Sequence, residues 1–145
     1  MLDNNATLTT TRTIPGTPHQ VFAAFQNPEL LAQWWGPKGF TNTFSHFDFT
    51  PGGRWVFVMH APNGANYQNE NIFRLIEQDS RIVIEHILQP WFILTITLAA
   101  VDNGTELTWA QRFETSEVAE QFRPLAATAN EQNLDRLTAV LTKTA

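Results

Sequence analysis

The 145-residue sequence contains no cysteine, so no disulfide can form and no disulfide-stapled secreted scaffold is expected. No apolar stretch approaches the ~18 residues of a membrane span, and Met1 to Asn5 lack the basic start and apolar run of a signal peptide. Basic residues are few and scattered, since 9 Lys and Arg stand against 14 Asp and Glu, a net charge of −5 that repels phosphate backbones. These absences predict a cytoplasmic protein that binds neither nucleic acid nor membrane.

Aromatic side chains, by contrast, are abundant for an acidic chain. Eleven Phe and five Trp supply rigid apolar volume that either fills a core or lines a ligand pocket. A chain of this length buries roughly 70% of its unfolded surface around one core, and no internal repeat, low-complexity segment or linker divides the sequence. We therefore predict a single domain over residues 1–145.

The first part of the sequence indicates a strand followed by two short helices. β-branched residues dominate residues 6–14 and favour a strand, which Pro15-Gly16 ends. The run Thr17-Pro18-His19-Gln20 combines a capping-box pattern with Pro at the first helical position. A second helix start follows at Asn27-Pro28, and Gly36-Pro37 ends that helix.

The middle of the sequence predicts six further strands. Segments rich in β-branched and aromatic residues alternate with turn signals such as Pro51-Gly52-Gly53 and Asp102-Asn103-Gly104. Consecutive strands at this spacing form an antiparallel meander. The predicted strands cover residues 40–48, 53–60, 67–77, 81–87, 92–101 and 105–113.

The last segment, from about Ser116, carries apolar residues at helical spacing and predicts a long amphipathic helix. Pro124 either kinks this helix or marks its start after a short turn. The order of strand, two short helices, six strands and long helix predicts an α+β helix-grip fold, in which an antiparallel sheet curves around the C-terminal helix.

Two motifs carry a resemblance to a known family: Trp34-Trp35-Gly36-Pro37, and the run from Asp48 to Trp55 that contains Pro51-Gly52-Gly53. Together with Leu134-Asp135-Arg136-Leu137, they make the sequence resemble bacterial relatives of the activator of the heat-shock-protein-ninety ATPase, in the START-related (SRPBCC) superfamily. The resemblance implies a helix-grip fold with a cavity between the sheet and the last helix. Members often carry a Trp early in that helix, where this sequence reads Ala129 to Asn133, so ligand preferences do not transfer from them.

Polar residues on apolar faces are candidates for orienting a ligand, because burying them without a partner is costly. His46 is expected on a strand face with Phe44, and His86 on another apolar strand face. Gln111 and Asn133 interrupt apolar stripes. Each either points into the pocket or hydrogen-bonds to the backbone or to the other. The predicted ligand-binding residues are Trp35, Phe44, His46, Trp55, Phe57, Met59, His86, Trp109, Gln111, Phe122 and Asn133.

Three functions are consistent with this pattern. The first is binding of a small hydrophobic or amphipathic molecule in the cavity, without a cofactor or metal, because no His pair has metal-ligand spacing. The alternative, which the resemblance implies because the superfamily includes such members, is an enzyme of cyclase, dehydratase or hydrolase type with a pocket His as acid or base, although the sequence has no triad spacing and no Cys nucleophile. A chaperone-interacting module is the third, disfavoured because the eukaryotic co-chaperones also use an additional amino-terminal domain. An exposed Phe or Trp at a sheet edge would indicate a homodimer.

Overall fold

The computed structural model describes residues 4–144, which form one antiparallel sheet and the helices that fill its concave side. Residues 1–3 and 145, the two ends of the predicted domain, lie outside the described residues. The strands are β1 (Thr7–Ile14), β2 (Thr41–Phe47), β3 (Arg54–His60), β4 (Asn66–Glu77), β5 (Arg81–His86), β6 (Phe92–Val101) and β7 (Gly104–Phe113). The helices are η1 (Asn4–Ala6), α1 (Pro18–Gln26), α2 (Pro28–Trp34) and α3 (Ser116–Thr144).

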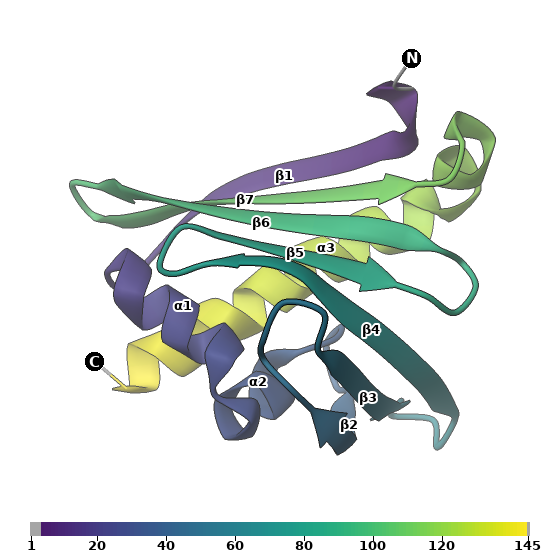
Figure 1. Ribbon diagram of the computed structural model, residues 1–145, viewed down its shortest axis with the longest axis horizontal. Helices are drawn as coiled ribbons and strands as arrows, with labels where there is room; N and C mark the ends of the chain where they lie inside the picture. Colours follow the sequence, from purple (N-terminus) through teal and green to yellow (C-terminus); the bar gives the residue numbers. More distant parts are fainter. Residues whose placement is uncertain (1–3, 145) are drawn as a thin grey trace.

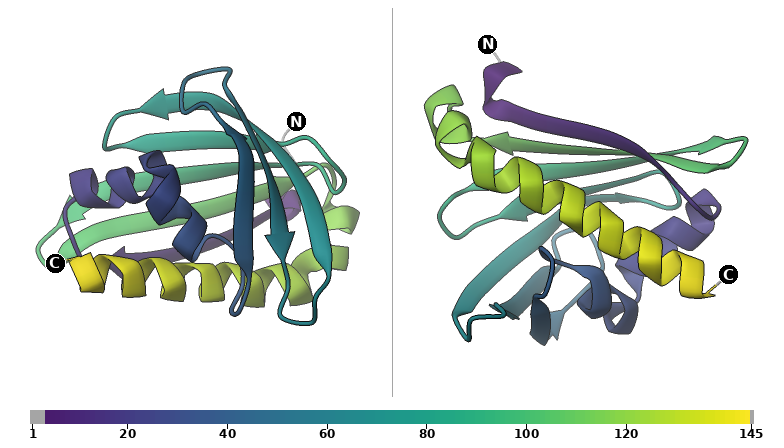
Figure 2. Two further views of the ribbon diagram at one scale, coloured as in Figure 1. Left: turned by 90° about the horizontal axis from the view of Figure 1, so that it is seen from below. Right: turned by 180° about the vertical axis from the view of Figure 1, so that it is seen from behind.

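The sheet has the strand order β1-β7-β6-β5-β4-β3-β2, so β1 and β2 form its edges. It curves around α3, which crosses the concave side, while α1 and α2 lie beside the C-terminal end of that helix (Figures 1 and 2). Apolar side chains of β3 to β7 and of all three α-helices meet there in one main core cluster. The arrangement confirms the predicted α+β helix-grip fold.

The strand boundaries agree with the sequence prediction to within one residue at each end, but the face assigned to His46 was wrong. The register of β2 against β3 shifts between Phe44 and His46, which marks a bulge at Ser45. An extra residue reverses the in-and-out alternation that follows it. Phe44 and Phe47 therefore both pack against the core, whereas His46 is exposed.

Helix α3 begins at Ser116 and continues through Pro124, so Pro124 does not mark its start. Proline provides no N–H for the helical ladder and its ring crowds the preceding turn, which bends a helix. The first turns of α3 are inclined to the rest of the helix (Figure 2). They pack on a small satellite cluster around Leu8, Phe113 and Ala119, whereas Leu134 and Leu137 belong to the main core.

The two motifs that carried the family resemblance form a helix terminus and a turn. Gly36 has a φ of +97°, and a Cβ there would lie 2.7 Å from Met59 Cε, so only glycine fits without movement. At Gly53 a Cβ would lie 2.0 Å from the carbonyl oxygen of Asp48. Both motifs therefore fix the backbone that brings Trp35 and Trp55 into the core.

Two side chains of α3 hold the connection between α2 and β2. Asn133 accepts a hydrogen bond from the Gly36 N–H at 3.1 Å and donates to the Trp34 carbonyl at 3.2 Å. The guanidinium of Arg136 donates to five carbonyl oxygens, one in the last turn of α2 and four in the connection, at distances of 2.8 to 3.0 Å. Those carbonyls belong to Gln33, Trp35, Gly36, Pro37 and Phe40.

We predict that Arg136→Lys lowers the free energy of unfolding by about 2 kcal/mol or more, because an ammonium group cannot serve carbonyls spread around a planar guanidinium. Urea denaturation at neutral pH measures this. The control is Arg123→Lys on the same helix, where the side chain pairs with Glu120 at the surface; there the change should stay below about 0.5 kcal/mol. Equal losses in the two variants would contradict the role given to Arg136.

Candidate ligand-binding site

The concave side of the sheet holds a cluster of three indole rings. The ring centroid of Trp35, the residue that ends α2, lies 4.9 Å from that of Trp55 on β3 and 5.6 Å from that of Trp109 on β7. Strands β3 and β7 are separated by three other strands in the sheet. The curvature of the sheet therefore lets both rings contact Trp35.

Phenylalanine rings extend this aromatic cluster along β2 and β3. Trp55 stacks on Phe57 with a centroid distance of 4.5 Å, and Phe44 contacts both rings edge-on at 5.4 and 5.6 Å. Six of the predicted ligand-binding residues belong to the main core cluster or pack against it: Trp35, Phe44, Trp55, Phe57, Met59 and Trp109.

Polar atoms without partners lie within this aromatic cluster. Among the described residues, the buried side-chain atoms that lack a hydrogen-bond partner are Asn42 Oδ1, Trp55 Nε1, Asn71 Oδ1 and Trp109 Nε1. The side chain of Asn42 already donates to the carbonyls of Ala32 and Trp35. The other three residues, Trp55, Asn71 and Trp109, are named here the interior polar site.

The unpaired indole groups contrast with two that are paired. Trp34 Nε1 donates to the Ala24 carbonyl at 3.0 Å, and Trp91 Nε1 donates to Glu85 Oε2 at 2.7 Å. Buried polar groups in folded proteins nearly always have partners. The unpaired N–H groups of Trp55 and Trp109 are therefore the candidates for contact with a bound molecule.

Asn71 belongs to this site but was missed in the sequence. It lies on β4, is 2% exposed, and is paired directly with Trp55 on β3 and with His86 on β5. Side chains of directly paired residues lie about 4.5–5.5 Å apart at Cβ, so the three form a row across three strands. The available signal was its spacing, two residues before the apolar Phe73 on a predicted strand.

His86 lies inside the protein, with both ring nitrogens engaged. Nδ1 is 2.8 Å from the Pro90 carbonyl and Nε2 is 2.9 Å from Asn69 Oδ1, while the ring stacks on Phe92 at 4.6 Å. Burial lowers the pKa of His86 and outweighs the raising effect of the backbone contacts. Asn69 Nδ2 donates to the Tyr67 carbonyl at 3.1 Å, which directs the Asn69 Oδ1 toward the ring.

Gln111 follows Trp109 on the same face of β7, and its Oε1 accepts a hydrogen bond from Asn130 Nδ2 at 3.0 Å. The partner of Gln111 is thus a side chain that was not expected from the sequence, and not the backbone or Asn133. Asn130 also lines a pocket of about 100 Å³ between β1 and α3. The other residues of that pocket are Leu8, Thr9, Thr10, Arg123, Ala127 and Glu131.

Three predicted ligand-binding residues lie away from the interior polar site. His46 is exposed. Asn133 is occupied by the Gly36 N–H and the Trp34 carbonyl. Phe122 stacks on Phe113 at 5.7 Å in the satellite cluster under the first turns of α3.

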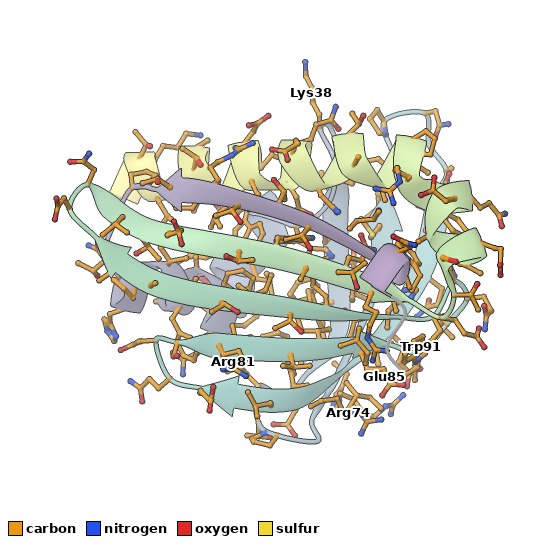
Figure 3. All side chains as sticks on the ribbon, turned by 90° about the horizontal axis from the view of Figure 1, so that it is seen from above. Lys38, Arg74, Arg81, Glu85 and Trp91 are labelled. Atoms are coloured by element: carbon orange, nitrogen blue, oxygen red, sulfur yellow. The ribbon has the colours of Figure 1, made fainter. Side chains whose placement is uncertain are left out.

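The outer face of the sheet carries a charged cluster in which the polar groups are satisfied. Arg74 and Trp91 both donate to the carboxylate of Glu85, which holds its pKa below the ordinary value, and Arg112 lies 5.9 Å from the Trp91 ring centroid. Arg74, Glu85 and Trp91 gather at one end of this face (Figure 3). A pocket of about 340 Å³ opens beside Trp91, with Ile87, Gln89 and Glu114 as its other lining residues.

The histidines do not share a site. His60 faces Thr43 and Asn66 at 2.7 and 2.6 Å, and His19 faces Asp79. Within residues 4–144, no group of three or more His, Asp or Glu side chains could hold a metal ion.

No helix in the part of the chain that the structure describes is long and apolar enough to cross a membrane.

We predict that His86 makes the protein less stable in acid. Its folded pKa lies below its unfolded value, so the unfolded chain binds more protons. The stabilising contribution is complete above about pH 6.5 and is lost as the pH falls through the folded pKa. In denaturation between pH 8 and pH 5, His86→Gln should show a smaller loss of stability than the wild type, whereas His46→Gln, the exposed control, should follow the wild type. Parallel curves for His86→Gln and wild type would contradict this.

Comparison with known proteins agrees with the fold and the motifs. The family model described as Activator of Hsp90 ATPase homolog 1-like protein matches residues 15–142. A search of the curated proteins found no match. Among solved structures, a protein of Rhodobacter sphaeroides is similar at 26% identity over all of this chain and 98% of that one, with a TM-score of 0.88.

Two further structures show the same fold. A protein of Nitrosomonas europaea is 20% identical over 100% of this chain and 99% of that one, with a TM-score of 0.88. An AHSA1-like protein of Aeromonas hydrophila is 20% identical over 92% of each chain, with a TM-score of 0.76. Because the family match covers nearly the whole chain, the protein belongs to the Activator of Hsp90 ATPase homolog 1-like family, within the SRPBCC type of fold.

Proposed function

We propose that the protein binds a small hydrophobic or amphipathic molecule between the concave face of the sheet and α3. The observation that carries this proposal is the pair of buried indole N–H groups, of Trp55 and Trp109, that have no acceptor within an aromatic cluster. Each such group costs about 1–3 kcal/mol when it is left unpaired. A bound molecule with a hydrogen-bond acceptor removes that cost, and the family's ligand-binding type of fold supports the proposal.

The aromatic surroundings set the character of the ligand. Sites of this kind hold a molecule mainly by apolar contact and use a few polar groups for orientation. Trp55 is 0% and Trp109 is 3% exposed, so a ligand reaches them only when neighbouring elements move apart. The seam between β1 and the first half of α3 contains the 100 Å³ pocket, and there the helix packs on the satellite cluster. Opening at this seam also requires breaking the bonds of Thr10 and Arg12 to Glu131.

Acid–base catalysis by a pocket histidine has less support. His86 has both ring nitrogens engaged and His46 is exposed.

The cytoplasmic location, the absence of nucleic-acid and membrane partners, and the chaperone-interacting alternative stay predictions. The homodimer also stays a prediction. The exposed large apolar side chains of the described residues are Tyr67, Leu88, Val101 and Leu125, and none of these is a Phe or Trp.

We predict that amphipathic molecules shift the indole N–H resonances of Trp55 and Trp109 in nitrogen-15 NMR spectra of the labelled protein. Suitable probes are alcohols such as the aromatic 2-naphthol and the aliphatic 1-decanol. Trp34 and Trp91 provide internal controls, because their N–H groups are already bonded to Ala24 and Glu85. Single Trp→Phe variants assign the resonances. If every probe leaves the Trp55 and Trp109 signals unmoved, or moves only Trp91, the proposed function is refuted.

A further inference from the structure

We infer that the interior polar site selects an uncharged ligand group that both donates and accepts a hydrogen bond, such as a carboxamide or a hydroxyl. This inference rests on the proposed function and narrows it to a chemical class. It follows from three properties of the described residues: which atoms are unpaired, how they are placed, and where the charges lie.

The unpaired atoms call for a ligand with both hydrogen-bonding capacities. Asn71 Oδ1 is an acceptor, whereas Trp55 Nε1 and Trp109 Nε1 are donors. A ketone, ester or ether would pair the indole groups and leave Asn71 unpaired. A carboxamide oxygen can accept from an indole while its N–H donates to Asn71, and a hydroxyl group can do the same with one oxygen.

The placement of these atoms allows one small group to meet both kinds. Trp55 and Asn71 are direct partners in the register of β3 and β4, on the inward face. The Trp109 ring, like the Trp55 ring, contacts Trp35. The apolar body of the ligand would then lie against the indole and phenylalanine rings, with its polar group at the row formed by Trp55, Asn71 and His86.

The concave face offers no free counter-ion to a charged ligand group. Among the described residues, the buried polar ones are Asn71, His86, Thr105, Gln111 and Asn133, none of which is an acid, a Lys or an Arg. Arg12 is paired with Glu131 and Asp135 at 2.7 and 2.6 Å, and Arg136 is occupied by backbone carbonyls. Burial also favours the neutral form of His86.

A carboxylate or ammonium group would therefore enter without a counter-ion. Burying an unpaired charge costs far more than burying a paired neutral group. The ion pairs Arg54–Glu70 and Arg74–Glu85 lie on exposed arginines of β3 and β4, outside the core cluster. Arg136, which donates to the Trp35 carbonyl, is a formal charge at the border of the aromatic cluster, and backbone carbonyls occupy its guanidinium.

The test uses one aromatic body with four substituents: 2-naphthamide, 2-naphthoate, (2-naphthyl)methylammonium and 2-methylnaphthalene. Affinities come from titrations of the wild-type protein at neutral pH, followed by the Trp55 and Trp109 indole signals. We expect 2-naphthamide to bind at least about tenfold more tightly than either ion, and more tightly than 2-methylnaphthalene.

Variants locate the preference. Asn71→Leu removes the acceptor at similar volume and should reduce the affinity for 2-naphthamide by about tenfold without weakening 2-methylnaphthalene. Trp55→Phe removes the indole donor and should also reduce the affinity for 2-naphthamide. Two variants keep the test valid if one of them fails to fold. Gln68→Leu, at an exposed position of β4, is the control and should retain the wild-type preference.

The outcomes separate the two proposals. If 2-naphthoate or the ammonium compound binds as tightly as 2-naphthamide, or if Asn71→Leu and Trp55→Phe keep the preference, the inference is overturned while ligand binding stands. If no member of the series moves the Trp55 and Trp109 signals, ligand binding in this site is contradicted and the inference falls with it.

Discussion

The contact of α3 with the α2–β2 connection determines how the rest of the interior is arranged. Arg136 and Asn133 satisfy backbone groups of a connection that has left helical geometry and not yet joined the sheet. Backbone groups in such a place need partners, and a helix that supplies them is fixed relative to the connection. The same contact holds Trp35 between Trp55 and Trp109. The position of the aromatic cluster thus depends on a polar interaction at its border.

The molecule satisfies its polar groups unevenly. On its outer surface, Glu85 is bonded by both Arg74 and Trp91. At the helix corner, Asn133 uses both its oxygen and its nitrogen. In the middle of the aromatic cluster, however, Trp55, Asn71 and Trp109 retain unpaired atoms. Three of the four unpaired buried atoms among the described residues belong to this site, and the fourth is Asn42 Oδ1. The proposed ligand would complete that surface, where a protein selected for stability alone gains from apolar residues.

Much of the fold could be predicted because local signals agree with it. Turn residues separate the strands, and Asn27-Pro28 and Gly36-Pro37 bound α2. The candidate site was less predictable, because it depends on which way side chains point. One extra residue at Ser45 places His46 outside, and no local pattern announces that bulge. Asn133 has the spacing of a core residue, but its role depends on Gly36, which is distant in sequence.

The segment 129–133 is a place where this chain departs from a frequent feature of the family it resembles. Members often carry a Trp in this region, where Asn130 here bonds to Gln111, two residues from Trp109 on the same strand face. The Asn130 side chain is smaller than an indole, and its amide adds a polar group beside Gln111. The motifs around Gly36 and Gly53 fix the backbone, whereas inward side chains such as Asn71, Gln111 and Asn130 determine what the interior can accept. Under the proposed function, these few positions and not the fold set the class of ligand.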